Sequence, residues 1–221
     1  MAGSFEVLEP ESWSNRTAII LAHGAGQGMH SPFMTYFHSE LAARGFLSVK
    51  FNFEYMDAKR HVPDPQPKLQ AHYRTVVENV LTEYKPARLV IGGKSMGGRV
   101  ASYIAGDTPG VNALVSLGYP LHPPGKMDQL RDQHLYALKI PMLFISGTLD
   151  ARTPISNAEE YRAGFANSTH IIIDGAVHSD PLFLSSPKIK EGMLEFLKGQ
   201  PVTATRISAP PMKFAPLIQQ K

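Results

Sequence analysis

The chain of 221 residues contains no cysteine, which excludes disulfide bonds and thiol catalysis. Its net charge is also small, +3 at pH 7, and its densest basic stretch, residues 59–61, is typical of a solvated loop rather than a nucleic-acid-binding surface. No apolar run approaches the length of a membrane span, and the first residues show no signal peptide. We therefore expect a cytoplasmic protein that binds neither nucleic acid nor membranes.

Short apolar runs alternate with segments of helical spacing along most of the chain. This alternation predicts an α/β protein with a mainly parallel sheet and helices on both faces. A first strand near Phe5 is expected to lie antiparallel at one edge. Residues 1–198 are expected to form a single domain, and the proline-containing residues 199–221 an extended tail that is loosely packed or docked on a neighbour. The expected strands are 17–22, 46–51, 88–92, 111–117, 141–147 and 169–173, and the expected helices are 32–44, 69–84, 98–105, one from about 154, and 187–197.

The most informative segment joins the strand at 88–92 to the helix that follows it. Gly93, Ser95 and Gly97 form a G-x-S-x-G motif at this junction. This is the pattern of a nucleophile elbow, a sharp strand-to-helix turn that exposes a serine hydroxyl above the end of a sheet. Glycine neighbours are needed because a Cβ there would collide with the flanking strand and helix.

Two other interpretations of this serine are available. A Walker A phosphate loop would require glycine at position 88, where the chain has Arg88. Alternatively, Ser95 merely caps a helix after a tight turn, which for an isolated motif is about as frequent. The choice therefore depends on residues elsewhere in the chain.

A glycine-rich loop follows the strand at 17–22 and starts with His23. Loops of this kind can direct backbone N–H groups at one point, so we expect Ala25, with Gly24 or Gly26 as alternatives, to supply one oxyanion donor and Met96 the other. His23 would then orient the loop. A dinucleotide-binding G-x-G-x-x-G motif is disfavoured, because its third glycine position is Met29.

Asp150 and His178 each follow an apolar strand-like run. A lone aspartate is more often a loop or capping residue, and a lone loop histidine more often lies on the surface. Together with Ser95, however, they occur in the order Ser, Asp, His, which is the order of the triad in α/β-hydrolases. The alternative position for the acid, after the strand at 111–117, reads Gly118-Tyr119-Pro120 and holds no carboxylate.

The remaining histidines do not suggest a metal site, since no recognisable ligand spacing is present. We expect no metal and no cofactor. His61, His72 and His134 are predicted to lie on the surface, whereas His122 and Tyr119 are predicted to line the substrate pocket, together with Gly24 and Gly26.

The chain resembles a small subgroup of predicted α/β-hydrolases. The resemblance rests on residues 92–99 (GGKSMGGR), 119–124 (YPLHPP), 130–132 (LRD) and 146–150 (SGTLD), and it extends over about 17–197. The subgroup includes bacterial proteins of this size and the hydrolase-like domains of a testis-expressed protein and of a subunit of the NSL histone-acetyltransferase complex. The resemblance implies the α/β-hydrolase fold but names no substrate.

These observations predict a serine hydrolase that uses Ser95, His178 and Asp150 on a small or medium acyl ester. Residues 118–139 leave room for a loop and one helix around 127–138, so we expect an open site without a large lid. A binding or scaffold protein that retains the fold, and an acyltransferase or perhydrolase with the same triad, stay open as alternatives. The sequence also leaves open whether the chain forms a homo-oligomer.

Overall fold

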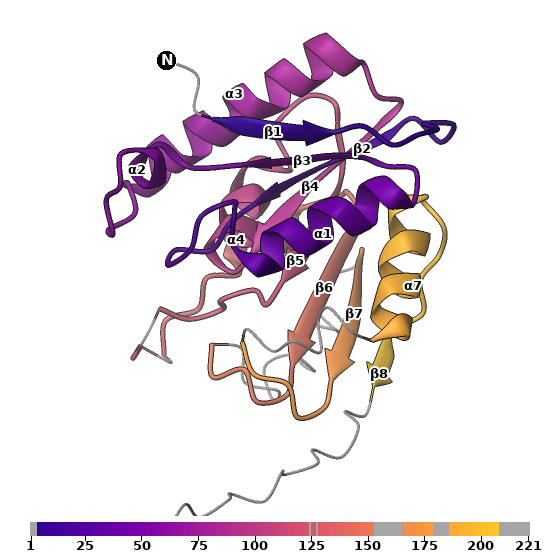
Figure 1. The fold of residues 1–221 in the computed structure, drawn as a ribbon. Helices are drawn as coiled ribbons and strands as arrows, with labels where there is room; N and C mark the ends of the chain where they lie inside the picture. Colours follow the sequence, from indigo (N-terminus) through magenta and orange to yellow (C-terminus); the bar gives the residue numbers. More distant parts are fainter. Residues whose placement is uncertain are drawn as a thin grey trace, which may run out of the picture.

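The computed structural model describes residues 4–123, 125–126, 128–152, 165, 167–178 and 186–207. Within them, eight strands form one sheet in the order β1-β3-β2-β4-β5-β6-β7-β8, and only β1 runs antiparallel to its neighbour (Figure 1). The strands are β1 Phe5–Leu8, β2 Thr17–Ala22, β3 Leu47–Phe51, β4 Arg88–Lys94, β5 Val111–Leu117, β6 Met142–Gly147, β7 Ser168–Ile173 and β8 Thr205–Ile207.

Helices cover both faces of this sheet (Figure 1). Helices α1 (Pro32–Ala43) and α7 (Pro187–Leu197) lie on one face, and α3 (Gln66–Tyr84) and α4 (Met96–Ile104) lie on the other. A single turn of helix, α2 (Glu54–Asp57), follows β3. The sheet direction and the two helical layers match the predicted fold class.

The two hydrophobic cores follow from the alternation of side chains along each central strand. In β2, Ala18, Ile20 and Ala22 point into the core beneath α3 and α4. Ile19 and Leu21 point into the core beneath α1 and α7. All six residues of β2 are buried, so this strand is enclosed on both faces.

Local signals in the sequence explain where the helices begin and end. The Ser31 hydroxyl accepts a hydrogen bond from the Met34 N–H, and Pro32 occupies the first turn of α1. Gly45 then takes a positive φ of 86° just after that helix, a conformation that glycine adopts without steric cost. These signals confirm the predicted helix at 32–44 to within one residue.

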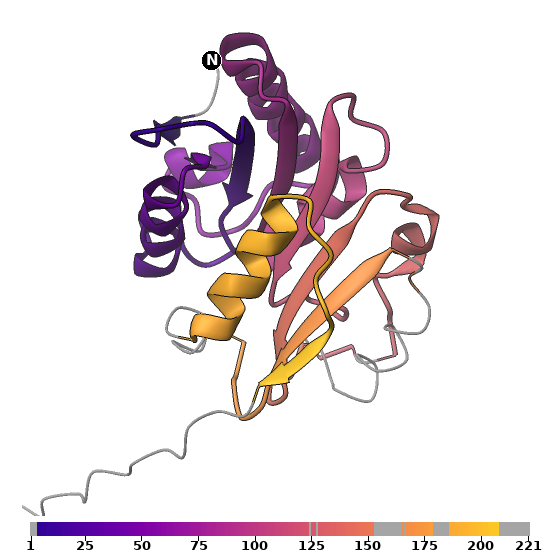
Figure 2. The same ribbon diagram turned by 90° about the vertical axis from the view of Figure 1, so that its right-hand side faces the viewer.

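The C-terminal segment contributes one further strand. Thr205–Ile207 pairs in parallel with β7 and extends the sheet by one strand (Figure 2). The sheet therefore includes part of the segment 199–221 that we expected to be a tail. Residues 208–221 lie outside the described residues, as does most of the helix expected from about 154.

The helix expected at 127–138 is wrong in extent, since the described residues of this range form only a 3₁₀ turn, Gln133–Ala137. The backbone of Arg131 explains the difference. Its N–H donates to the Leu121 carbonyl, and its carbonyl accepts from the Tyr119 hydroxyl. The N–H is then not available for a helical hydrogen bond, and the carbonyl is engaged by a side chain from another segment. The described part of 118–139 accordingly contains no helical lid.

Candidate active site

Ser95 lies in the sharp turn between β4 and α4. Its backbone has φ 52° and ψ −115°, a conformation that a residue with a side chain rarely adopts and that stores strain. Its N–H donates to the Leu117 carbonyl and its carbonyl accepts from the Arg99 N–H, so the sheet and the helix together hold the turn. The predicted strand-to-helix turn is present.

Glycines permit this turn because the backbone passes very close to its neighbours. A Cβ on Gly93 or on Gly97 would overlap the carbonyl oxygen of Ala22 in β2. A Cβ on Gly98 would overlap the Ser116 side chain on β5. The helix can therefore start directly above the sheet only because these positions lack side chains.

The structure brings Ser95, His178 and Asp150 together from three separate loops. The Ser95 Oγ lies 2.8 Å from His178 Nε2, and His178 Nδ1 lies 2.7 Å from Asp150 Oδ2. Because a carboxylate can only accept, Nδ1 carries the proton and Nε2 accepts from the serine hydroxyl. This tautomer leaves Nε2 ready to take the serine proton.

Burial and neighbouring charges set the protonation of this group of residues. The Asp150 side chain is fully buried, and its second oxygen accepts the backbone N–H of Arg152 at 2.9 Å. The pKa of His178 is lowered from 6.5, mainly by burial, although the Asp150 hydrogen bond opposes the shift and the charges of Lys94 and Arg152 reinforce it. His178 is therefore neutral at neutral pH, the form that a general base requires.

The absence of an acid after β5 also has a structural explanation. Gly118 has φ 67°, and a Cβ on it would come within 2.8 Å of Lys94 Nζ and 3.3 Å of His178 Nδ1. The space beside the imidazole is thus filled by the lysine and the ring itself. A carboxylate can reach Nδ1 from the end of β6 instead.

The loop after β2 passes directly beside Ser95. A Cβ added to Gly24 would lie 3.6 Å from the Ser95 Cβ, whereas one on Gly26 would meet nothing within 4 Å. Gly24 therefore borders the site, and Gly26 faces open space. A separate hollow of about 480 Å³ lies further along the loop, with walls that include Gln27, Gly28, Asn52 and Met56.

His23 holds this loop, as predicted. It is fully buried, its Nδ1 bonds to the Gly24 carbonyl at 2.6 Å, and its Nε2 accepts the Phe53 N–H at 3.1 Å. Burial lowers the pKa of His23, which keeps the ring neutral and suited to one donated and one accepted bond. Because a trans peptide is planar, fixing the Gly24 carbonyl also fixes the direction of the Ala25 N–H.

Tyr55 is a second support of this loop that the sequence did not reveal. Its hydroxyl donates to the Ala25 carbonyl at 3.0 Å, and its ring is buried. It comes from α2, a helix of four residues that is too short to leave a periodic pattern. The signal that could have identified it is its position just after the end of β3.

Tyr119 and His122 correct our expectation of the substrate pocket. Both are only 1% exposed. The Tyr119 hydroxyl donates to the Arg131 carbonyl, and its ring packs edge-on against Phe144 in the core. Their burial keeps both side chains from offering a surface to a substrate, because the loop after β5 folds inward against the core.

Of the three histidines predicted to lie on the surface, His72 is buried and His134 is half-buried. His72 is buried against Phe51 and Phe53, and His134 stacks on Tyr103 with its Nε2 2.8 Å from the Ser102 hydroxyl. Aromatic neighbours from other elements shelter both rings, and such contacts between distant segments cannot be derived from the residues around one histidine. His61 is exposed as expected.

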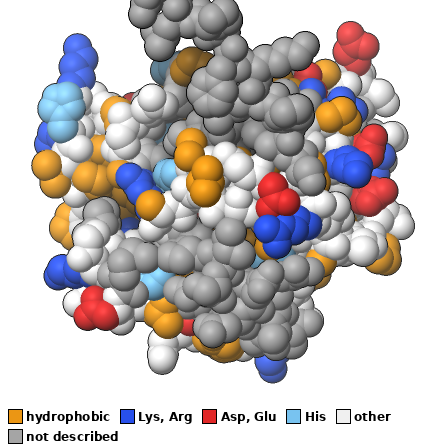
Figure 3. All heavy atoms as spheres, turned by 90° about the horizontal axis from the view of Figure 1, so that it is seen from below, with side chains coloured by type: hydrophobic (Ala, Val, Ile, Leu, Met, Phe, Trp, Pro, Cys, Tyr) orange, Lys and Arg blue, Asp and Glu red, His pale blue; other side chains and the backbone are white. Residues whose placement is uncertain are grey.

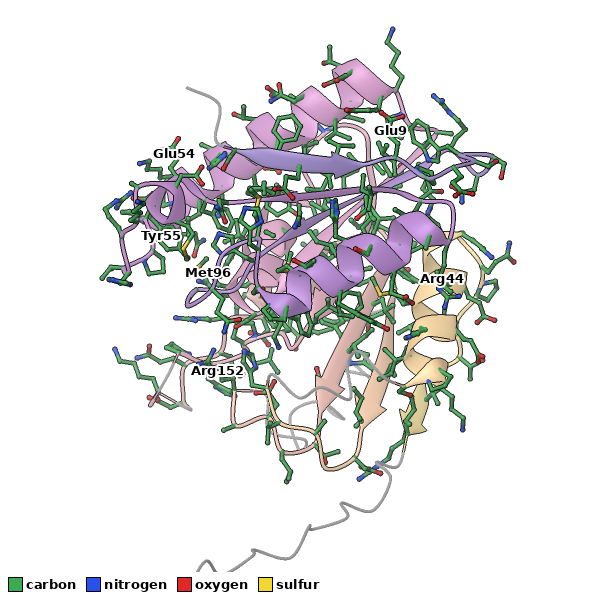
Figure 4. The ribbon with its side chains drawn as sticks, in the orientation of Figure 1. Glu9, Arg44, Glu54, Tyr55, Met96 and Arg152 are labelled. Carbon is green, nitrogen blue, oxygen red and sulfur yellow. The ribbon has the colours of Figure 1, made fainter. Side chains whose placement is uncertain are left out.

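Arg152 and Lys94 lie at the site although no role was predicted for either. Arg152 Nη1 is 3.4 Å from the Ser95 Oγ, and Lys94 donates to the His178 carbonyl. Met96 and Arg152 lie on the same side of the molecule (Figure 4). From below, the side toward which β6 and β7 point, basic, acidic and hydrophobic side chains are interspersed among the described residues (Figure 3).

The described part of the chain offers neither a metal site nor a membrane span. No cluster of three or more histidine, aspartate or glutamate side chains within it could hold a metal ion. No helix within it is long and apolar enough to cross a membrane.

Comparison with known proteins agrees with this architecture. Residues 15–194 match the family model described as an alpha/beta hydrolase domain. An alpha-beta serine hydrolase homologue from Coxiella burnetii is 18% identical, with a TM-score of 0.70, and the match covers 88% of this chain and 89% of that one.

Two further solved structures are similar. A serine hydrolase without lid from Xanthomonas campestris is 20% identical with a TM-score of 0.68, over 90% of this chain and 89% of that one. A dienelactone hydrolase from Anabaena variabilis is 20% identical with a TM-score of 0.67, over 88% of both chains. At these identities the likeness concerns the fold, and it confirms the predicted fold class.

Proposed function

Because this chain belongs to the alpha/beta hydrolase domain family, we propose that it is a serine hydrolase that cleaves a small or medium acyl ester, of the carboxylesterase or thioesterase type. The observation that carries the proposal is the hydrogen-bonded chain from Ser95 through His178 to Asp150, with distances of 2.8 and 2.7 Å. A serine that only capped its helix would need neither partner, and the Ser95 side chain makes no capping hydrogen bond to α4.

In the first half of the reaction, the Ser95 oxygen attacks the ester carbonyl carbon while its proton passes to His178 Nε2. Asp150 holds the imidazole and stabilises its charged form. The tetrahedral intermediate then expels the alcohol or thiol, which takes the proton from His178. The ester bond is thereby exchanged for an acyl bond to Ser95.

In the second half, a water molecule gives a proton to His178 and attacks the acyl-enzyme. Collapse of the second intermediate returns the proton to Ser95 and releases the carboxylic acid. We assign the oxyanion donors to the Met96 and Ala25 N–H groups. The fixed Gly24–Ala25 peptide and the position of Met96 at the start of α4 support this assignment. Losing one such donor costs about 10²–10³ in turnover.

The first test is covalent labelling of the purified chain with a fluorophosphonate probe, followed by mass spectrometry of the adduct. We expect labelling on Ser95 and its loss in Ser95→Ala and His178→Ala. The matched control is Ser116→Ala, which removes another buried serine, one without a hydrogen-bond partner among the described residues. It should retain labelling and the hydrolysis of short esters and thioesters.

Two results would redirect the proposal. A folded chain that is not labelled at Ser95 and cleaves no ester would be a binding or scaffold protein that retains the fold. Labelling with product analysis that finds the acyl group on an added alcohol or on peroxide, rather than on water, would identify an acyltransferase or a perhydrolase.

Two finer expectations belong with this proposal. Residues 92–99 and 119–124 support a closer relation to the subgroup that includes the testis-expressed and NSL-complex hydrolase-like domains. We also propose a cytoplasmic location. A small-molecule ester is the only partner that the proposed reaction needs.

A further inference from the structure

Arg152 is fixed beside the nucleophile at two points. Its backbone N–H donates to Asp150 Oδ1 at 2.9 Å, which closes a tight turn just after β6. From this turn its side chain reaches the site, where Nη1 lies 3.4 Å from the Ser95 Oγ. The same aspartate that orients His178 therefore also positions this arginine.

The acyl-transfer reaction itself has no need of this guanidinium. The serine proton goes to His178, and the oxyanion is assigned to two backbone N–H groups. A positive charge here even opposes catalysis, because Arg152 and Lys94 both disfavour the imidazolium that must form on His178. We therefore expect Arg152 to have another role that offsets this unfavourable effect on His178.

The charge of Arg152 is also not matched by an ion pair with any carboxylate among the described residues. Within the part of the chain that the structure describes, no acidic side chain forms an ion pair with it, and Asp150 Oδ2 is already bonded to His178. Arg152 is exposed, and its guanidinium carries five N–H donors, one of which contacts the Ser95 hydroxyl. Among the described groups there, two cations, Lys94 and Arg152, surround the single carboxylate of Asp150.

We propose that Arg152 binds a carboxylate on the substrate, so that the preferred ester carries an anionic group a few bonds from its scissile carbonyl. This rests on the proposed hydrolase function. During attack the carbonyl carbon lies about 3 Å from the serine oxygen. Because the guanidinium contacts the same oxygen, only a group close to that carbon along the substrate chain can pair with it. A carboxylate suits it, since the guanidinium fork binds both oxygens.

A bound substrate carboxylate would also remove the unfavourable effect of the Arg152 charge on the protonation of His178. The carboxylate neutralises the guanidinium, and the imidazolium that forms on His178 then meets less repulsion. Charged esters should consequently benefit in the transition state as well as in binding. We therefore expect Arg152 to influence kcat for these esters in addition to KM.

The experiment uses two pairs of esters that differ in charge but little in shape. Monoethyl succinate against ethyl pentanoate places the carboxylate on the acyl side, and O-acetylglycolate against propyl acetate places it on the alcohol side. Hydrolysis of all four is followed by pH-stat titration on the full chain. We expect the wild type to favour the charged ester of one pair by about tenfold or more in kcat/KM.

Arg152→Gln should reduce that charged-to-uncharged ratio by about tenfold, and Arg152→Lys should retain part of it. Arg44→Gln is the control, since it removes the same charge from an exposed arginine on the opposite side of the molecule (Figure 4). Its ratio should equal that of the wild type.

The outcomes separate this inference from the function on which it rests. If Ser95 is labelled and uncharged esters are cleaved, but Arg152→Gln leaves the ratio unchanged in both pairs, then the inference is wrong and the hydrolase function stands. If Ser95 is not labelled and no ester is cleaved, both fail.

Discussion

Lys94 Nζ donates a hydrogen bond to the backbone carbonyl of His178, which ties the turn that carries Ser95 to the loop that carries the imidazole. Lys94 is only 8% exposed, and burial lowers its pKa to about 8. It is therefore still mostly protonated at pH 7. Its charge and its bond both act on His178, one on protonation and the other on position.

Replacing this lysine should change the pH dependence of the enzyme. Burial lowers the pKa of His178 below 6.5, and the Lys94 charge adds to that shift. Since the imidazole must be neutral to act as a base, wild-type kcat/KM should fall only as the pH drops below 6.5. In Lys94→Met the midpoint of that fall should move to higher pH. Profiles of kcat/KM against pH measure it, with the exposed Lys139→Met as control. An unmoved or lower midpoint would contradict the prediction.

Gly118→Ala should disturb the site through both backbone and contact. The residue has φ 67°, and its new Cβ would lie 2.8 Å from Lys94 Nζ and 3.3 Å from His178 Nδ1. We expect a loss of about 1 kcal/mol in unfolding free energy and a loss of turnover of about tenfold or more. Gly125→Ala is a matched control, because Gly125 has φ 72° but no atom within 4 Å of its Cβ. It should lose similar stability and keep its turnover. Equal turnover in the two variants would show that the contact of the new Cβ with Lys94 and His178 does not affect catalysis.

The backbone strain at Ser95 should be measurable as a difference in unfolding free energy between two variants. Alanine retains the strained φ of 52°, whereas glycine adopts it at no steric cost. Ser95→Gly should therefore unfold with a free energy about 1 kcal/mol greater than Ser95→Ala, although glycine loses more chain entropy on folding. Denaturant titration of the two inactive variants gives the difference. Equal stability would mean that the turn is not strained.

Acid should destabilise the fold through a histidine far from the site. Burial, reinforced by Lys50, lowers the pKa of His38 to about 4. As the pH falls from 6.5, the unfolded chain binds a proton at this residue before the folded chain does, so this contribution to stability is lost between about pH 6.5 and pH 4. It is on the order of 1–3 kcal/mol. His38→Gln should flatten the decline of unfolding free energy with pH, as followed by urea titration. An unchanged slope would rule out His38 as a source.

Much of the architecture could be predicted because it depends on local sequence. The strands at 17–22 and 111–117 and the helix at 187–197 match the structure residue for residue. Each is a mainly apolar run or a helical pattern, and glycines flank the strand at 111–117 while Ser186 and Gly199 lie at the ends of the helix. The 3₁₀ turn at 133–137 and β8 were not predicted, because a distant hydroxyl bonds Arg131 and a three-residue strand has no period.

The order of amino acids alone sets which residue types stand at the ends of the strands, including Ser95, Asp150 and His178. Chain order and strand ends are properties of the chain alone, and a parallel sheet then brings those ends to one edge. The side chains that surround them were set by the tertiary fold. It placed Arg152, Lys94 and Tyr55 at the site and withdrew Tyr119 and His122 into the interior, because such contacts join residues far apart in the sequence and depend on how neighbouring elements pack.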